Sequence, residues 1–406
     1  MSMKKWNTLF IAAFFIFLTA TVITHPQASL QASKNGLAMW WEVVFPSLLP
    51  FFILSELLIS FGIVRFVGVL LEPFMRPIFR VPGVGGFVLA MGMASGFPSG
   101  AKLTTRLRQE RQLTRIEAER LVSFTNSSNP LFIFGAVAVG FFHHPALGIV
   151  LASAHYLGNL AVGVTMRGYK ARHDAHLRSR KKFLLPPFKE AFNALHTARL
   201  AEKRPLGQIL SDAVMSSVQT LFMIGGFIIL FSVFSKMLSV VHVTDLLSIG
   251  LGYMLQTLHL PPELDLAMIA GLFEITLGSQ LTGSQEVTLL AKTIVVSFIL
   301  GFSGFSVQAQ VAGILAATDI RFKPFFFARL LHGIYAAVFA FLLFKPLYLY
   351  VSRSDMALPA GAFDASQQVV MFSSVVWNQL VTAGPLITIC SLIVYITLYY
   401  RKLKNG

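Results

Sequence analysis

Long apolar stretches alternate with short polar connections along most of the chain. Several stretches approach the roughly 20 residues that an α-helix needs to span a bilayer. They include residues 9–24, 38–61, 146–164, 221–234, 326–344 and 387–400. A soluble protein with so much apolar helix surface would aggregate. The pattern therefore predicts an all-α polytopic membrane protein.

Two apolar segments are too short or too interrupted for an ordinary span. Residues 83–96 form a run that ends just before Pro98, and the very polar segment 102–120 follows. Residues 264–283 are broken by glycines and polar side chains at 277–283, where we place the turn of this segment. We predict two re-entrant helical hairpins, one over 83–116 that enters from the inner side and one over 264–283 that enters from the outer side.

The helix after each hairpin is also expected to be broken. The first, over 117–142, is interrupted by TNSSNP at 125–130, and the second, over 286–320, is interrupted within 301–310. Backbone that leaves a helix inside a bilayer strands amide and carbonyl groups, so it is tolerated only where it lines a cavity. Matched interruptions in two halves point to a transporter's binding site. The fold class predicted is two inverted repeats, each with a hairpin and a broken helix.

These features divide the chain into five parts. They are an N-terminal transmembrane helix with an outer segment (1–36), a first inverted repeat (37–166), a basic cytoplasmic loop (167–205), a second inverted repeat (206–350), and an outer loop with a last transmembrane helix and a basic tail (351–406). Within them, 26–36 is expected to stay outside, and the basic amphipathic stretch 65–80 suits the inner membrane interface.

Charge supports this topology. The chain has a formal net charge of +15, yet only 13% of its residues are charged, against about 25% in soluble proteins. Segment 167–204 alone holds eleven Lys or Arg and three acidic residues, as expected of a cytoplasmic loop. Both termini are then cytoplasmic, and we expect the lipid bilayer, not nucleic acid, as partner. With Cys390 alone, no disulfide can form within the chain.

The interruptions carry residues suited to helix starts. Asn129 and Pro130 fit an N-cap and a first helical position, and Ser99 can cap the helix that resumes after Pro98. Thr282 and Gln285 have the spacing of a capping box. Helix N-termini aimed at the membrane interior present free amides and partial positive charge, which suits carboxylates and phosphates.

Four charged residues lie near the interruptions. Lys102 and Arg106 follow the first hairpin tip on one helix face, Glu274 precedes the second tip, and Lys292 lies on the next helix. Charges at membrane depth are costly and usually functional. Lys102 and Arg106 bind an anion or only set topology. Glu274 either pairs with a Lys or Arg or binds a coupling ion.

The candidate substrate-binding residues follow from these positions. They are Ser95, Ser99, Gly100, Lys102, Arg106, Asn126, Ser127, Asn129, Glu274, Thr276, Ser279, Gln280, Ser303, Ser306 and Gln308. Several of the polar ones could instead serve the broken backbone. His155 and His332, at similar places in the two halves, are interpreted as packing residues. The sequence shows no nucleophile–base pair, cofactor motif or metal-ligand set, so we expect neither an enzyme nor a cofactor.

The interruptions also carry a family resemblance. MGMASGFPSGAKLTTRLRQE, LTRIEAERLVSFTNSSNPLFIFGAVAVGFF and HYLGN in the first half, with FEITLGSQ in the second, resemble the sporulation membrane proteins of the nucleoside-recognition (Gate) family. Gate proteins are related to concentrative nucleoside transporters, which have two inverted repeats with hairpins and unwound helices. The resemblance covers nearly the whole chain.

The resemblance implies secondary transport of dipicolinic acid out of the mother cell across the outer forespore membrane. Helix N-termini with Lys102 and Arg106 would suit the two carboxylates of dipicolinate. Two alternatives remain, a nucleoside-type transporter and a non-transporting membrane assembly protein with a Gate fold. A coupling ion, H⁺ or Na⁺, and a homo-oligomeric state are further partners that the sequence leaves open.

Overall fold

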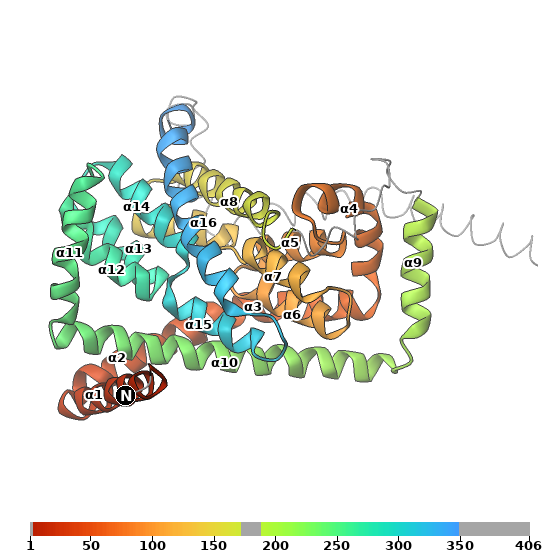
Figure 1. Cartoon of the computed structure of the whole chain (residues 1–406), viewed down its shortest axis with the longest axis horizontal. Coiled ribbons are helices and arrows are strands. Elements are labelled where there is room, and N and C mark those ends of the chain that lie inside the picture. The colour runs from red at the N-terminus through yellow and green to blue at the C-terminus, as the bar shows by residue number, and fades with distance from the viewer. Residues whose placement is uncertain (1–2, 172–187, 349–406) are drawn as a thin grey trace, which may run out of the picture. The chain divides into compact units, whose positions relative to one another are not determined.

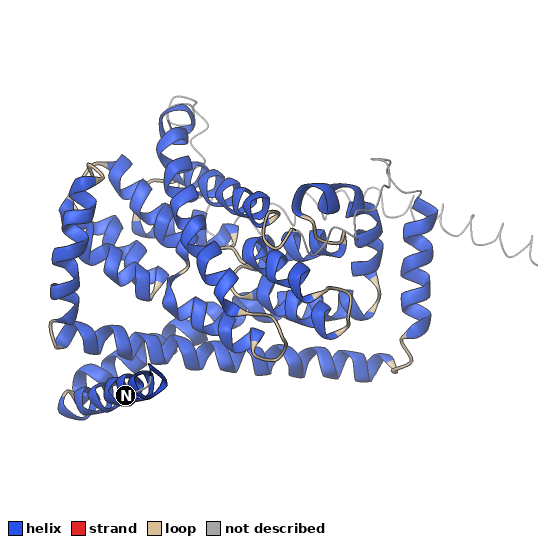
Figure 2. Cartoon of the chain, in the orientation of Figure 1, coloured by secondary structure: helices blue, strands red, loops and turns tan. Residues whose placement is uncertain are grey.

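The structure is a computed structural model that describes residues 3–171 and 188–348, and these contain helices and no strand (Figure 2). In chain order the elements are α1 (Met3–Thr24), α2 (Pro26–Ala38), the π-helix η1 (Met39–Val44), α3 (Phe45–Ser60), α4 (Ile63–Phe79), α5 (Val84–Ser95), α6 (Ser99–Gln109), α7 (Arg115–Thr125), the π-helix η2 (Leu131–Phe141), α8 (Leu147–Met166), α9 (Phe188–Ala201), α10 (Leu206–Val240), α11 (Val243–Thr257), the 3₁₀-helix η4 (Pro262–Leu264), α12 (Asp265–Phe273), α13 (Ile275–Ser284), α14 (Leu289–Phe302), α15 (Gly304–Leu315), α16 (Phe322–Leu343) and the π-helix η5 (Phe344–Tyr348). The predicted last transmembrane helix and its flanks, 351–406, lie outside the described residues.

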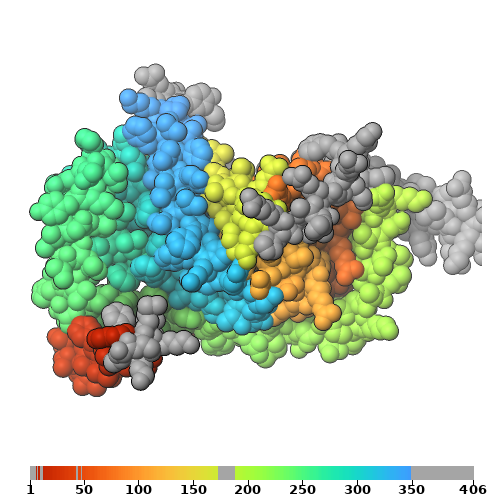
Figure 3. Space-filling view, in the orientation of Figure 1, coloured from red at the N-terminus to blue at the C-terminus, as the bar shows by residue number. Residues whose placement is uncertain are grey.

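Two series of elements repeat the same order. The first is α3, α4, the hairpin α5–α6, the broken helix α7–η2 and α8; the second is α10, α11, the hairpin α12–α13, the broken helix α14–α15 and α16. The contacts between them are reciprocal, because α6 packs on α15, α13 packs on η2, and α8 packs on α16. Figures 1 and 3 show α8 and α16 side by side. This confirms the predicted fold class, two inverted repeats that each contain a hairpin and a broken helix.

Short half-helices explain why few elements qualify as spans. Within residues 3–171 and 188–348, four helices or helix pairs are long and apolar enough to cross a membrane, and six if each of two bent pairs counts as one span. The arms of the hairpins have 9 to 12 residues, well below the roughly 20 that a crossing needs. Arms of this length have to turn back inside the bilayer.

The start of the chain is more helical than expected. Segment 26–36, expected as a short outer connection, belongs to α2, which bends by 101° from α1. Ser29, Ala32 and Gly36 are buried, and a Cβ atom on Gly36 would meet the Cα of Ile229 on α10 at 3.0 Å. Close packing against α10 therefore stabilises a segment whose polar composition suggested a loop.

The predicted interfacial stretch is a helix of the expected kind. α4 bends by 82° from α3 at a turn whose Gly62 has a φ of +79°. Its face with Val64, Met75 and Phe79 is buried in the main core, while Arg65 is exposed. The amphipathic character agrees with the sequence, the apolar face packs on the protein, and the place at the inner membrane interface stays a prediction.

Candidate functional site

The first broken helix is interrupted over residues 126–130. α7 ends at Thr125, Asn126 has an extended conformation with φ −100° and ψ 98°, and η2 begins at Leu131. The break therefore lies at TNSSNP, as predicted. A helix end leaves its last carbonyl groups without intrahelical partners, and inside a membrane other protein groups have to supply them.

Side chains from α8 and α16 supply partners for the freed carbonyls of α7. Arg329 of α16 donates to the backbone oxygens of Ser123 and Asn126, at 2.6 Å for Asn126. Asn159 of α8 donates to the oxygen of Phe124 at 2.6 Å and accepts from Arg329 at 3.2 Å. The end of a helix in the first repeat is thus held partly by an arginine of the second.

The first hairpin lies directly against this break. An added Cβ atom on Gly92 of α5 would lie 1.9 Å from the carbonyl oxygen of Thr125, and one on Gly100 of α6 would lie 2.1 Å away. Only glycine fits at these distances. The predicted candidate Gly100 therefore serves close backbone approach and brings no functional group of its own.

Asn129 joins the break to the hairpin tip. Its Oδ1 accepts from the backbone amide of Phe132 at 2.8 Å, and its Nδ2 donates to the carbonyl oxygen of Ser95 at 3.1 Å. The first bond satisfies a free amide at the start of η2, which confirms the predicted capping role. The second bond fixes the distance between the tip and the resumed helix.

The second break is tighter than the first. α14 ends at Phe302, Ser303 has a left-handed conformation with φ 69°, and α15 begins at Gly304. The break was expected anywhere within 301–310, and the structure confines it to one residue. Gln308 donates to the carbonyl oxygen of Phe302 at 3.0 Å, so a side chain one turn on closes the interruption.

The tip of the second hairpin lies at Glu274, not within 277–283 as predicted. Glu274 is extended between α12 and α13, and its carboxylate accepts from the amides of Thr276 at 3.0 Å and Leu277 at 2.8 Å. No ion pair of Glu274 with a Lys or Arg occurs within the described residues. The carboxylate is the N-cap of α13, where the helix dipole favours negative charge. Among the described residues the pairing alternative thus has no partner for Glu274, and the carboxylate serves the helix start instead.

With the corrected tip, the spacing of the repeats agrees closely. The sequence positions of Pro98 and Asn126 differ by 28 and those of Glu274 and Ser303 by 29, and in each repeat a histidine follows the break by 29 residues.

Those two histidines, His155 and His332, meet where α8 packs on α16. Their ring centroids are 4.6 Å apart. His155 Nε2 accepts from the amide of Ser128 at 3.0 Å, and His332 Nε2 donates to the carbonyl oxygen of His155 at 2.8 Å. Both are buried. They pack as predicted. Because each follows its own break by 29 residues, the contact joins equivalent positions of the two repeats.

A group of buried polar side chains around the breaks keeps hydrogen-bonding capacity unused. Each has at least one side-chain atom that meets no partner in the described residues and is at most 2% exposed. They are Ser95, Asn126, Ser128, Ser303 and Gln308. A buried polar atom without a partner costs about 1–3 kcal/mol. Four of the five were candidates from the sequence. This group, which we call the break cluster, is the candidate binding site.

Lys102 and Arg106 are paired with acidic side chains. Glu56 of α3 lies 3.4 Å from Lys102 Nζ and 3.9 Å from Arg106 Nε, and it accepts from the hydroxyl of Ser216 on α10 at 3.2 Å. Lys102 Nζ also lies 4.6 Å from the centre of the Phe52 ring. Arg106 Nε also lies 3.0 Å from Glu110 Oε1, so the two cations at this junction of α3, α6 and α10 are matched by two acids.

The remaining candidates are placed less centrally. Ser99 donates to the carbonyl oxygen of Gly96 and does not cap α6, and Ser127 donates weakly to that of Gly92 at 3.4 Å. Ser279 bonds within α13, while Ser306 is buried in the first turn of α15. Gln280 and Thr276 are partly or fully exposed on α13.

Two helix-end predictions need correction. Thr282 donates to the carbonyl oxygen of Gly278 inside α13 and Gln285 ends that helix, so they form no capping box. Their spacing matched, but the second tip lies earlier than assumed. A capping box does occur at the start of α7, between Thr114 and Glu117. Lys292 donates to the carbonyl oxygen of Gly283 at 2.8 Å, and it therefore serves the end of α13.

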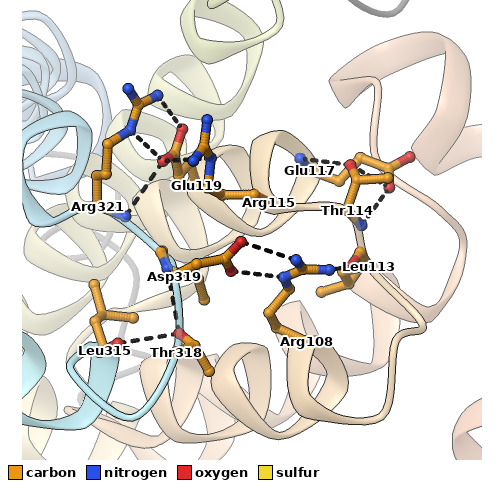
Figure 4. A network of polar contacts seen from close by, with 11 residues as sticks. Arg108, Leu113, Thr114, Arg115, Glu117, Glu119, Leu315, Thr318, Asp319 and Arg321 are labelled. Carbon is orange, nitrogen blue, oxygen red and sulfur yellow. Dashed lines mark hydrogen bonds and ion pairs between the residues drawn. The ribbon is translucent and has the colours of Figure 1, made fainter.

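Ion pairs join the two repeats near the start of α7 and the end of α15. The helix breaks lie at the other ends of these two helices. Arg108 donates two hydrogen bonds to Asp319 at 2.8 and 2.9 Å, and Arg321 donates to Glu119 at 2.7 and 3.0 Å (Figure 4). The bonds from Arg108 hold the pKa of Asp319 below its usual value. We call these two contacts the inter-repeat pairs. Segments predicted to share the cytoplasmic face thus lie together.

Sequence reasoning missed Arg329, Asn159 and Glu56. Each is a polar or charged residue within an apolar helical run, at 0%, 2% and 7% exposure. That is the signal of an internal partner or site. The predicted site residues all came from the interrupted segments and their flanks. Arg329, Asn159 and Glu56 lie instead on the neighbouring helices α16, α8 and α3.

Comparison with known proteins assigns the family. Residues 41–143, which hold the first hairpin and break, match the family model described as Gate, nucleoside recognition. The whole chain is 67% identical to the sporulation integral membrane protein YlbJ of Bacillus subtilis, over 99% of that protein. An uncharacterized protein of Alkalihalophilus pseudofirmus is 32% identical over 32% of the chain and 28% of its own length.

No solved structure matches the chain. The full-length identity and the Gate match together establish that the chain belongs to the family of sporulation integral membrane proteins represented by YlbJ, whose first half carries a Gate domain.

Proposed function

We propose that this protein is a secondary transporter of a small organic anion, dipicolinate, which it moves out of the mother cell across the outer forespore membrane. The observation that carries the proposal is the break cluster. Both repeats interrupt a helix beside a hairpin tip and surround the interruption with buried polar atoms that meet no protein partner within the described residues. Such arrangements in inverted repeats are typical of transporter binding sites.

Charge favours an anion over a neutral solute. The carboxylate of Glu274 is already held by two amides of α13. Lys102 and Arg106 are balanced by Glu56 and Glu110. Arg329, which donates to the backbone at the first break, forms no ion pair with an acid among the described residues, and a carboxylate of the substrate would balance its charge.

The relatives support the setting. The name of the Bacillus subtilis relative places that protein in sporulation and in a membrane, and identity over the full length supports the same setting for this chain. The description of the Gate model, nucleoside recognition, favours a second candidate, a nucleoside transporter.

Uptake into proteoliposomes tests the proposal. The purified chain should give saturable uptake of radiolabelled dipicolinate, which excess unlabelled dipicolinate reduces and excess uridine does not. Imposing a pH gradient or a sodium gradient in separate arms identifies the coupling ion. Saturable uptake of radiolabelled uridine without uptake of dipicolinate would favour the nucleoside transporter, and absence of any flux would favour an assembly protein without transport.

Two variants connect the flux to the site. We expect Lys102→Ala and Glu274→Ala to reduce uptake while the protein remains in the membrane, because each removes a charge beside a hairpin tip. Normal flux in both variants would show that the site is placed wrongly.

A further inference from the structure

Arg329 is a buried cation without a carboxylate partner. It is 0% exposed, and within residues 3–171 and 188–348 no acidic side chain forms an ion pair with it. Its hydrogen bonds go to the backbone oxygens of Ser123 and Asn126, to Asn159 Oδ1 at 3.2 Å and to His332 Nδ1 at 3.0 Å. Its Nε finds no partner among the described residues.

The repeat architecture does not require this arginine. Arg329 lies three residues before His332, and the residue three before the matching His155 is Ala152. The second break closes without a cation, because Ser303 turns the chain in one residue and Gln308 binds the carbonyl of Phe302. The two breaks are therefore unequal, and only the longer one has a guanidinium against it.

A buried charge of this kind needs compensation. The carbonyl groups at the end of α7 supply part of it, since a helix C-terminus carries partial negative charge. They supply no full unit of charge, and an ion at membrane depth remains costly. Arg329 bonds directly to the backbone of Asn126, whose side-chain amide is an unpaired member of the break cluster. An anion bound at the side chain of Asn126 would complete the compensation.

We propose that Arg329 is the residue that selects the charge of the substrate, so that the site prefers a dianion over a monoanion or a neutral molecule of the same shape. This inference rests on the proposed transport function. Arg329 acts on the substrate through its field, and it positions the first break through its bonds to Ser123 and Asn126. A residue that only held the break would affect ligands of any charge equally.

A matched ligand series separates these roles. Uptake kinetics are measured with pyridine-2,6-dicarboxylate (dipicolinate), pyridine-2-carboxylate and pyridine-2,6-dicarboxamide, which carry two, one and no negative charges. In Arg329→Gln we expect KM for the dianion to rise at least tenfold, KM for the monoanion to rise less, and KM for the neutral amide to change least. Arg329→Lys keeps the charge but loses the two hydrogen bonds of the guanidinium to the backbone at the end of α7. It should therefore keep the preference for the dianion over the monoanion and the neutral amide, with a lower uptake rate for all three.

A control accounts for the loss of any buried arginine. Arg120 is also 0% exposed and donates to the backbone oxygens of Tyr169 and Arg80, away from the breaks. Arg120→Gln should lower uptake of all three ligands by one common factor. If Arg329→Gln does the same, Arg329 has no part in charge selection and the inference is overturned.

A second variant covers the case in which Arg329→Gln does not fold. Asn126→Asp keeps the shape of the side chain and places a carboxylate beside Arg329. It should abolish the preference for the dianion, because the protein then supplies the compensating charge itself. An unchanged preference would also overturn the inference. Failure of the transport proposal looks different, since the unmodified protein would then move none of the three ligands.

Discussion

Two glycines set how closely the first break approaches the first hairpin. A Cβ atom on Gly92 or Gly100 would lie 1.9 or 2.1 Å from the carbonyl oxygen of Thr125, and a backbone atom cannot rotate away. We expect Gly92→Ala and Gly100→Ala each to cost about 1–3 kcal/mol, the usual range for overpacking a core. Thermal unfolding in detergent should show a lower midpoint for both.

Gly226 on α10 provides the matched control. A Cβ atom there meets nothing within 4 Å, so Gly226→Ala should leave the midpoint unchanged or raise it, since alanine is favoured over glycine in a helix by about 0.5–1 kcal/mol. Equal midpoints for all three alanine variants would mean that the hairpin does not touch the break.

The sequence reveals some residue roles and hides others for physical reasons. Asn129 before Pro130 is a local signal, because a cap and its amide lie three residues apart, and the structure confirms it. Arg329 serves carbonyl groups about 200 residues away in the chain. No local sequence pattern indicates a partner so distant in the chain. Arg329 also lies close in sequence to Lys323, so it can be interpreted as one more basic residue at the cytoplasmic end of a helix.

At the scale of elements, the cap of α13 depends on Glu274. Its carboxylate accepts from two amides that would otherwise face a buried hairpin tip without partners. Loss of a capping side chain costs about 1 kcal/mol in exposed helices, and an unsatisfied buried amide adds to this. Glu274→Ala should therefore lower the unfolding midpoint and the uptake rate together.

Glu274→Gln separates capping from charge. The amide oxygen of glutamine can still accept from Thr276 or Leu277, so the midpoint should recover most of the loss. Uptake that recovers with it would assign Glu274 a structural role only. Uptake that stays low at a restored midpoint would assign the carboxylate a part in coupling-ion binding.

Elements were predictable where composition changes within an apolar run. The first hairpin and both broken helices followed from short lengths and from glycine, proline and asparagine at the interruptions. The second tip was misplaced because IAGLFEITLG reads as continuous helix, and only the cap at Glu274 marks the turn. Segment 26–36 looked like a loop because its helix depends on packing against α10, a contact that is distant in sequence.

At the scale of the whole molecule, the inter-repeat pairs link regions that transport would have to separate. Arg108 lies at the end of the first hairpin and Asp319 between α15 and α16, and both side chains are partly exposed, at 27% and 49%. The lowered pKa of Asp319 has a consequence for pH. Stability from this pair is present above the usual aspartate pKa of about 3.9 and is lost as pH falls through the lowered pKa of the folded state.

Unfolding midpoints across pH test this assignment. At pH 6 the unfolding midpoint of the unmodified protein should be higher than that of Asp319→Asn. The difference between the two midpoints should shrink only below about pH 3.9. Arg108→Gln leaves the Asp319 carboxyl in place but removes the arginine that lowers its pKa. Its unfolding midpoint at pH 6 should equal that of Asp319→Asn. A difference that disappears already near neutral pH would point to another group.

Exchanging the two charges tests whether the pair controls transport. Alternating access rocks one repeat against the other about a fixed site, so a contact between repeats at one face biases which face is open.

Arg108→Asp alone and Asp319→Arg alone set like charges together and should change the uptake rate by about two- to fivefold, as expected for a surface pair worth up to about 1 kcal/mol. The double variant should return toward the original rate. Arg204 and Asp212 form a pair of similar length and exposure that does not join the two repeats, and the same exchange there should leave uptake unchanged. Equal effects of the two exchanges would show that the position between repeats has no importance, whereas rescue confined to Arg108 and Asp319 would identify this face as a gate.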